Sequence, residues 1–382
     1  MSIAVSAPTG RRLATRVGLV RQFDPTFLMT ILLAMLVSLW MIASAARPAC
    51  GREWTDEIFE KKAAAIPYVA IASHDLGKAH SVIGSIRYYQ TQQKDTFLDI
   101  ARYYALGYEE LVDANPGVDP WIPPAGRVIM LPTEFVLPEG DYSGVVVNIP
   151  EMRLYYFHKG SVGTHVTTYP VGLGRDEWRT PQGKFKIRGK TKNPTWVLPE
   201  SIKKEHRADG RPAPDFIPGG DPENPLGKYR LELTLNSYGI HGTNIPWGVG
   251  MQVSHGCVRL YPEDIERLFP LIPVGAAGEF AYQPVKVGAR EGRIYVEMHR
   301  DIYNLLPAPY REARRLIEKN GWTAFVDMKE VERAVTEQNG IPVDVTLDGE
   351  PSNETPQDEL PEEIVPSMRT TGRQSEALGS SR

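Results

Sequence analysis

Short runs of β-branched and aromatic residues, separated by Gly, Pro, Asn or Asp, recur between residues 143 and 300 of this 382-residue chain. Such runs predict short β-strands, because branched and aromatic side chains suit a pleated, half-buried surface and the intervening residues form turns. The expected strands cover residues 145–147, 154–157, 164–171, 184–188, 231–235 and 279–283. Strands this short and this frequent favour a mainly β fold, built as a sandwich.

Composition sets broad limits on the class of protein. A hydrophobic content of 42% is ordinary for a soluble protein, and a net charge of −4 gives no reason to expect a nucleic-acid partner. The length leaves room for two or three domains. The chain has only two cysteines, Cys50 and Cys257, which excludes a disulfide framework.

Cys257 lies in the segment Ser254-His255-Gly256-Cys257-Val258-Arg259, a short distance after His241-Gly242-Thr243-Asn244. A thiol attacks carbonyl groups as the thiolate, so it needs a nearby base such as His241 or His255. Gly256 permits a tight turn that aims backbone N–H groups at a developing oxyanion. The pattern therefore predicts a nucleophilic cysteine. The alternatives are a buried apolar cysteine, and a zinc site of His241, His255 and Cys257 that lacks the closely spaced ligand pairs of structural zinc.

Together the two segments resemble the signature of the L,D-transpeptidase catalytic domain. Further matches occur in the order found in proteobacterial cell-wall members of that family, at residues 144–150, 153–157, 170–172, 180–183, 193–196 and 224–227. The resemblance covers about residues 143–300.

The resemblance implies a cysteine acyltransferase that acts on peptidoglycan stem peptides and needs no metal or cofactor. Cys257 would attack the carbonyl between the third residue, meso-diaminopimelate, and the terminal D-alanine of a tetrapeptide stem. D-Alanine would leave, and an amine acceptor would resolve the thioester. His241 matches the general base, oriented by the backbone carbonyl of Gly242. His255 would support or polarise the site, although a structural histidine is an equal alternative, and the N–H groups of Gly256 and Cys257 would form the oxyanion hole.

Five further residues are expected to bind substrate: Arg259, Ser254, Tyr238, Trp196 and Asn244. The charge of Arg259 could lower the thiol pKa or hold a substrate carboxylate, whereas a structural salt bridge would look the same in sequence. Aromatic residues near an active site are also common in cores. On the same footing, carbapenems are expected to acylate Cys257.

The amino terminus carries an export signal. Residues 27–43 form an apolar run without charge, after Arg11, Arg12, Arg16 and Arg21. Ala43-Ser44-Ala45 offers a cleavage site, whereas the long basic extension favours an uncleaved inner-membrane anchor. Residues 1–46 are therefore expected to direct the remainder to the periplasm or cell envelope.

Residues 85–133, after a linker at 47–84, predict a strand, two helices and a strand. Thr96-x-x-Asp99 forms a capping box for a first helix through Tyr104, and residues 108–115 form a second. This pattern resembles a LysM module, which binds glycan strands, although Gln93-Lys94 stands where a glycine is usual. A small packing domain without carbohydrate affinity is the alternative.

The remaining segments are predicted from local signals. Helices are expected at residues 262–269, 310–319 and 328–338, with 301–340 as a helical extension and 341–382 as a disordered tail. Prolines and glycines between Trp196 and Leu231 argue against long regular elements and favour a lid over the substrate groove, or else a disordered insertion.

Three functional classes remain open. A transpeptidase would form 3→3 cross-links or attach an outer-membrane lipoprotein lysine to peptidoglycan. A hydrolase would use water as the acceptor, and a binding protein would have lost its activity. The sequence does not choose the acceptor.

Overall fold

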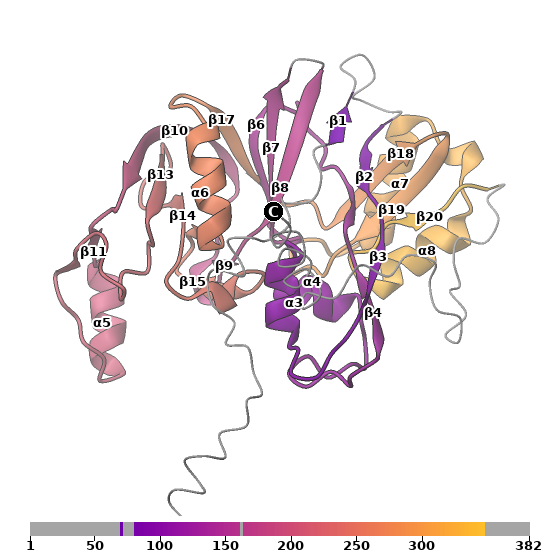
Figure 1. The fold of residues 1–382 in the computed structure, drawn as a ribbon. Helices are drawn as coiled ribbons and strands as arrows, with labels where there is room; N and C mark the ends of the chain where they lie inside the picture. Colours follow the sequence, from indigo (N-terminus) through magenta and orange to yellow (C-terminus); the bar gives the residue numbers. More distant parts are fainter. Residues whose placement is uncertain (1–68, 72–79, 161–162, 348–382) are drawn as a thin grey trace, which may run out of the picture. The chain divides into compact units, whose positions relative to one another are not determined.

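The computed structural model describes residues 69–71, 80–160 and 163–347 (Figure 1). The apolar run at 27–43, Cys50 and the tail from residue 348 lie outside these ranges. Across the described ranges, no helix combines the length and apolar character needed to cross a bilayer. The predictions of an export signal and an anchor therefore stay predictions.

A nine-stranded sheet is the largest β structure in the described ranges. Its strands, in spatial order, are β1 (Val69–Ile71), β8 (Thr164–Pro170), β7 (Arg153–Lys159), β6 (Gly144–Asn148), β17 (Ala277–Ala281), β10 (Gly183–Lys192), β13 (Tyr229–Leu233), β14 (Gly239–His241) and β16 (Val258–Arg259). Neighbours are antiparallel except for the parallel pairs β6–β17 and β14–β16. The six expected strands are all present, which confirms the mainly β fold.

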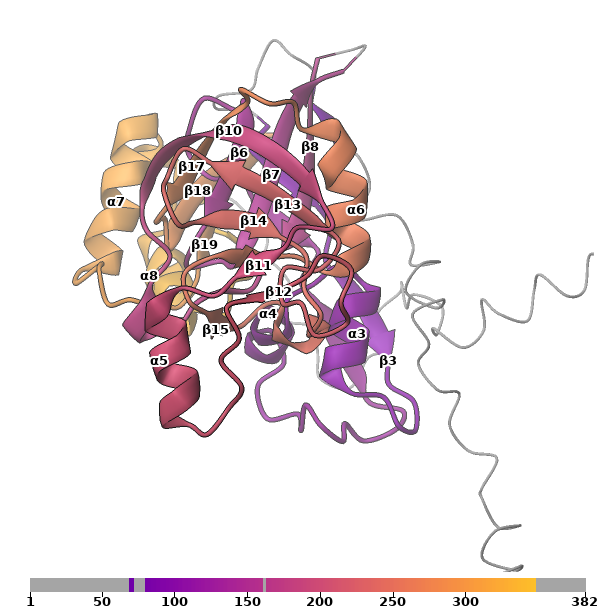
Figure 2. The ribbon, with the colours of Figure 1, turned by 90° about the vertical axis from the view of Figure 1, so that its left-hand side faces the viewer.

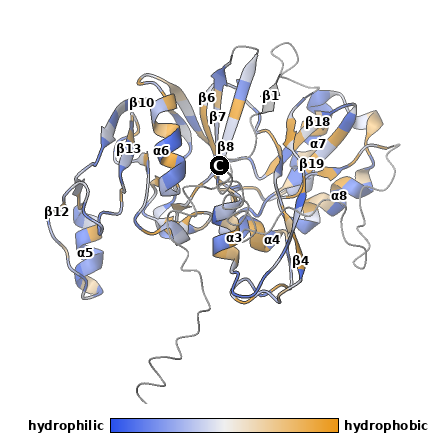
Figure 3. Ribbon diagram, viewed as in Figure 1, coloured by the Kyte–Doolittle hydropathy of each residue, from blue (hydrophilic) through white to orange (hydrophobic). Residues whose placement is uncertain are grey.

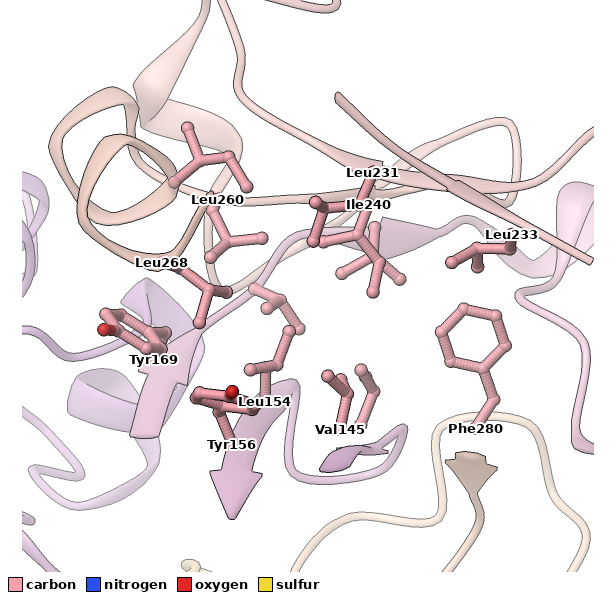
Figure 4. Close-up of a cluster of buried hydrophobic side chains, with 14 of the residues drawn as sticks. Val145, Leu154, Tyr156, Tyr169, Leu231, Leu233, Ile240, Leu260, Leu268 and Phe280 are labelled. Atoms are coloured by element: carbon pink, nitrogen blue, oxygen red, sulfur yellow. The ribbon is translucent and has the colours of Figure 1, made fainter. Parts of the chain in front are cut away.

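One hydrophobic core joins the two ends of this sheet. Val145 and Leu154 from β6 and β7 share a cluster with Leu231 and Ile240 from β13 and β14 (Figure 4). Strands separated by β17 and β10 in the sheet order thus face each other across one core. The expected sandwich is formed by a single curled sheet. Helix α6 (Pro262–Leu271) adds Ile265, Leu268 and Phe269 to the same core, and it begins with proline at a first-turn position as predicted.

The other face of β7 is covered by the amino-terminal module. Side chains alternate along a strand, so Leu154 and Tyr156 enter the first core while Tyr155 and Phe157 enter a second. The second core also contains Phe97 and other module residues. The module consists of β2 (Val82–Gly84), β3 (Arg87–Gln90), α3 (Phe97–Tyr103), α4 (Tyr108–Asp113), β4 (Val128–Leu131) and β5 (Glu134–Val136). The sheet therefore completes the hydrophobic core of the module.

The local order predicted for the module is confirmed. Strand β3 pairs antiparallel with β4, with α3 and α4 between them in sequence. The Thr96 hydroxyl accepts a hydrogen bond from the Asp99 amide, which caps α3. Membership of the LysM family stays a prediction.

Polar contacts hold the module against the catalytic region. Arg102 of α3 makes a bidentate ion pair with Glu263 of α6, at 3.1 and 3.0 Å. Arg153 of β7 pairs with Glu110 of α4 at 2.6 Å, and its side chain is fully buried. At the amino end of α4, the Glu109 amide donates to the Gly250 carbonyl at 3.2 Å. The module thus contacts the segment that joins the two motifs.

A third substructure follows the sheet. It contains β18 (Val285–Arg290), β19 (Arg293–Met298), α7 (Pro309–Asn320), the 3₁₀ turn η3 (Thr323–Phe325), α8 (Met328–Glu337) and β20 (Val343–Asp344). Val285 and Val296 pack with Ile317 and Val335 in a core of their own. The expected boundary at residue 300 therefore lies too late, because β18 and β19 pack with the helical extension. The expected disordered tail begins too early, because Val343 and Val345 are buried in this core.

A buried charge cluster links the three substructures. The Lys286 ammonium lies 2.8 Å from a carboxylate oxygen of Glu151 and 2.6 Å from one of Glu297, and it donates to the Val136 carbonyl at 2.7 Å. His299 Nε2 lies 2.5 Å from Glu297 Oε1. The three charged side chains Lys286, Glu151 and Glu297 are at most 1% exposed.

The proline-rich segment is more regular than predicted. It contains β11 (Trp196–Val197), α5 (Glu200–Ala208) and β12 (Phe216–Ile217), with β11 and β12 paired. A nine-residue helix fits because Pro199 is its N-cap and Pro212 follows it, so neither interrupts it. Figure 3 shows α5 as largely hydrophilic. The segment is therefore a structured arm, and its role as a lid stays a prediction.

Candidate active site

The two motifs meet on one face of the sheet, at β13, β14 and β16. Ile240 pairs with Val258, and both side chains are fully buried in the core. Alternation then places His241, Cys257 and Arg259 on the opposite face. Figure 2 shows β13 and β14 side by side. The remaining short elements around this face are β9 (Leu173–Gly174), η1 (Asp176–Trp178), η2 (Pro246–Gly248) and β15 (Gln252–Ser254).

Cys257 is the only free cysteine among the described residues, and its thiol lies against backbone groups. The sulfur accepts a hydrogen bond from the Gly239 amide and donates one to the Ser237 carbonyl at 3.8 Å. Burial raises the pKa of the Cys257 thiol, against the lowering influence of Gly239, Arg230 and Arg259. The resting nucleophile is therefore a neutral thiol that needs a base at the moment of attack.

His241 is oriented as such a base. Its Nδ1 lies 2.6 Å from the Gly242 carbonyl oxygen. Because a carbonyl only accepts, Nδ1 carries the proton and Nε2 of the neutral ring is left as an acceptor. Burial lowers the pKa of His241 to about 3, with a further lowering by the charges of Arg259 and Arg230. The imidazole is thus uncharged at neutral pH. The contact with Gly242 is the one implied by the family resemblance.

The turn before Cys257 is held by Ser254. Its hydroxyl donates to the Cys257 carbonyl at 2.6 Å and accepts from the Gly256 amide at 3.0 Å. The side chain of Ser254 is buried, so we expect it to shape the turn rather than to bind substrate. The Gly256 amide is likewise engaged, which removes one of the two expected oxyanion donors. The Cys257 amide has no acceptor within the described part of the chain and remains the candidate.

Thr180 fixes the orientation of that candidate amide. Its hydroxyl donates to the Gly256 carbonyl at 3.1 Å and accepts from the Gly174 amide at 3.0 Å. In a trans peptide the C=O and the following N–H point in opposite directions. Holding the Gly256 carbonyl therefore directs the Cys257 N–H away from Thr180. Tyr303 supports this arrangement, because its hydroxyl donates to the Gly174 carbonyl and accepts from the Thr180 amide. Sequence reasoning missed both roles.

His255 faces the arm rather than standing as a second base. Its Nε2 donates to Glu205 of α5 at 2.8 Å, and its ring lies edge-on to Trp178 with centroids 5.2 Å apart. Glu205 also accepts from Arg175 at 2.7 Å. These two donors lower the pKa of Glu205 to about 2, Arg175 first and His255 second. Burial lowers the pKa of His255 despite Glu205. The pair ties α5 to the nucleophile segment.

The other expected substrate-binding residues lie in separate parts of the catalytic region. Tyr238 packs against Gly256, where an added Cβ would lie 2.7 Å from its ring. Trp196 lies on β11, opposite Ile217. Asn244 donates to the Pro222 carbonyl at 3.2 Å, and its side-chain oxygen is buried without a hydrogen bond. Asn244 also lines a cavity of about 460 Å³ whose walls do not include Cys257.

The zinc alternative is not supported by the positions of its ligands. In the described ranges, one group of acidic and histidine side chains converges closely enough to hold a metal ion: Glu151, Glu297 and His299. His241, His255 and Cys257 do not converge in this way. In the converging group, the Lys286 ammonium lies between the two carboxylates and already supplies a cation.

Comparison with known proteins decides the family. Residues 143–287 match the family of the L,D-transpeptidase catalytic domain. The chain is 35% identical over 258 residues to the probable L,D-transpeptidase YcfS of Escherichia coli K12, covering 64% of this chain and 79% of that protein. The chain belongs to the L,D-transpeptidase family.

Two further relatives from the same organism fit this assignment. The probable L,D-transpeptidase ErfK/SrfK is 33% identical over 267 residues, covering 68% of this chain and 84% of that protein. The probable L,D-transpeptidase YbiS is 41% identical over 201 residues, covering 52% of this chain and 64% of that protein. The match to YbiS thus spans less than two thirds of its length. These relatives support a transpeptidase of the ErfK/YbiS type.

Proposed function

We propose that this chain is a peptidoglycan L,D-transpeptidase with Cys257 as nucleophile and His241 as general base. The observation that carries the proposal is the arrangement on the face of β14 and β16 that points away from the core of Ile240 and Val258. The His241 ring is fixed by the Gly242 carbonyl at 2.6 Å, and the Cys257 thiol is held by the Gly239 amide. Cys257 is two residues before Arg259, the partner of His241 on β16, so it lies on the same face. A base and a thiol held in this way suit acyl transfer.

The first half-reaction forms a thioester. The Cys257 sulfur attacks the carbonyl that joins diaminopimelate to the terminal D-alanine, while its proton passes to Nε2 of His241. The Cys257 amide, oriented by Thr180, stabilises the oxyanion. When the carbon–nitrogen bond breaks, the imidazolium returns the proton to the departing amine. D-Alanine leaves, and the acyl group remains on sulfur.

The second half-reaction transfers the acyl group to an amine. The acceptor nitrogen attacks the thioester, His241 takes one of its protons, and the thiol is restored when the carbon–sulfur bond breaks. The acceptor is a second stem peptide, which gives a 3→3 cross-link. The lysine of an outer-membrane lipoprotein is an alternative acceptor that the test below distinguishes.

The proposal includes a location and a second partner. Residues 27–43 carry the chain to the periplasm, with the inner membrane as anchor if the segment is uncleaved. The module binds glycan strands, and the exposed Trp121 supports this because its indole is 57% exposed beside Tyr108, with ring centroids 6.0 Å apart. Exposed aromatic rings of this kind can stack on sugar rings.

The test is incubation of the purified full chain with a tetrapeptide-stem muropeptide, with product masses followed over time. We expect a dimer that has lost one D-alanine, and no product with Cys257→Ala. His241→Ala should reduce acylation far more than His255→Gln, because His255 pairs with Glu205 rather than with the thiol.

Each other outcome has a definite meaning. A tripeptide without a dimer would indicate water as the acceptor, or a lipoprotein lysine if adding that protein restores transfer. Unchanged substrate together with no mass gain from a carbapenem would refute the proposal. Equal losses in the two histidine variants would show that the base is misassigned.

A further inference from the structure

Two arginines that have no side-chain hydrogen bond or ion pair with any described residue flank the proposed catalytic histidine. Arg230 on β13 is the cross-strand partner of His241, and His241 is in turn the partner of Arg259 on β16. Paired positions share a sheet face, and adjacent strands are about 4.8 Å apart. Arg230 and Arg259 are therefore separated by roughly 10 Å at the backbone, which two long side chains can span.

Neither guanidinium has an acceptor within the part of the chain that the structure describes. Among residues 69–71, 80–160 and 163–347, no carboxylate lies within ion-pair distance of Arg230 or Arg259, and the Nε of each is buried there without a hydrogen bond. Buried arginines elsewhere in this chain are paired, as Arg102 is with Glu263 and Arg153 with Glu110. Burying part of a guanidinium without a partner costs free energy. We therefore infer that these two arginines are kept for binding rather than for stability.

Glu232, an acid on the same face of β13 as Arg230, is already engaged. Glu232 is opposite Gly239 on β14, and its carboxylate accepts from Thr191 at 3.0 Å and lies 3.6 Å from Arg188. Gly239 leaves room for Arg230, since a Cβ on Gly239 would lie 3.2 Å from the Arg230 Nε. Arg230 thus lies beside the residue whose amide binds the Cys257 sulfur.

We propose that Arg230 and Arg259 together bind a carboxylate of the donor stem, and that Arg230 makes the enzyme select stems in which the residue just after the scissile bond carries a free carboxylate. This inference rests on the proposed function and names the group that the site recognises. The scissile carbonyl carbon and the terminal carboxylate carbon are separated by one nitrogen and one Cα, which puts them about 3–4 Å apart. Arginines that lie close to the Cys257 sulfur are therefore also close to the terminal carboxylate of a bound donor.

The geometry accounts for discrimination as well as binding. Guanidinium groups bind carboxylates through paired, charge-assisted hydrogen bonds, which a neutral amide forms only weakly. A stem with one more residue presents an amide at the same position. Diaminopimelate carries a second carboxylate on its side chain, so the two sources of this chemistry must be separated by experiment.

The experiment compares three donors with the full chain: the tetrapeptide acid, its C-terminal carboxamide, and the acid amidated on the diaminopimelate side chain. D-Alanine or D-alaninamide release gives KM and kcat for each donor. We expect Arg230→Gln to lower kcat/KM for the tetrapeptide acid roughly tenfold or more, mainly through KM, and to abolish its advantage over the C-terminal carboxamide. Arg230→Lys should restore part of that advantage. Arg314→Gln, which removes an exposed charge on α7, is the matched control.

A second arm does not depend on catalysis. Binding of the same donors to Cys257→Ala protein should favour the terminal acid, and the preference should be lost when Arg230→Gln is added. Absence of product from every donor would count against the proposed function but leave this arm to judge the subsite. Equal affinity for acid and carboxamide, or a preference that survives Arg230→Gln, would overturn the proposal. A preference that follows the side-chain carboxylate instead would assign the subsite to diaminopimelate and overturn the selection of free termini.

Discussion

Thr180→Val tests how the oxyanion donor is held. The Thr180 side chain is 2% exposed, and valine keeps its shape while removing the hydrogen bonds to the Gly256 carbonyl and the Gly174 amide. Leaving each buried partner unsatisfied costs about 1–3 kcal/mol, so we expect a loss of about 2–6 kcal/mol in the free energy of unfolding. The freed peptide can rotate, and complete loss of one oxyanion donor lowers the rate about 10²–10³-fold.

The assay is the rate of Cys257 acylation by a carbapenem, measured from the mass gain of the protein, beside urea unfolding. Thr180→Ser keeps the hydroxyl and should remain within about threefold of the wild-type rate. Val335→Ala is the stability control, because Val335 is buried in the separate core of α7, α8 and β18–β20. Acylation of Thr180→Val at the wild-type rate, or slowed no more than in Val335→Ala, would refute the role of Thr180.

Two further predictions concern buried ionisable groups. The pKa of His241 falls from 6.5 to about 3, so the unfolded chain binds the extra proton between these pH values and stability is lost as pH falls from 6.5 towards 3. For each pH unit below 6.5, the unfolding free energy of His241→Gln should therefore rise by about 1.4 kcal/mol relative to that of the wild type. Urea titrations at several pH values measure this difference, and the same pH dependence in both proteins would contradict the prediction. Lys286→Met should cost about 3–5 kcal/mol at pH 7, because Glu151 and Glu297 lose their shared cation. Burial acts to raise the pKa of Glu151 but Lys286 holds it low, so the loss in unfolding free energy should become smaller in acid. The double variant Lys286→Met/Glu297→Gln should recover part of the lost stability, and a loss that does not change with pH would contradict this explanation.

Local signals predicted the elements that depend on nearby residues. The six strands of the catalytic region follow from runs of branched and aromatic side chains, and the first module helix from the Thr96 cap. The same holds for the two motifs, since the base and the nucleophile are each defined by a few adjacent residues. Their meeting on one sheet face required the parallel pairing of β14 with β16, which was not predicted; the family resemblance implied only that His241 and Cys257 act together.

Contacts between distant residues were not predicted. Glu151 is far in sequence from Lys286 and Glu297, which pair across the β18–β19 hairpin, and each of the three is typical of a surface charge until the fold buries them together. Tyr303 lies beyond the expected catalytic boundary yet supports Thr180. Helix α5 was missed because prolines were counted without their positions, although a proline before a helix does not interrupt it.

The charges around the site suggest how binding and chemistry are joined. Burial lowers the pKa of His241 most, and the charges of Arg259 and Arg230 lower it further, which keeps the ring neutral but also makes it a weak base. A general base works best when its pKa lies near the working pH. A donor carboxylate bound between the two arginines would cancel their charge, so the pKa of His241 would rise while the stem occupies the site. The pKa of the Cys257 thiol would rise as well, because the same two arginines act to lower it. Because the pKa of the base and that of the thiol would shift together, the proton transfer between them gains little, and a stem that lacks this carboxylate should lose mainly affinity, which appears in KM.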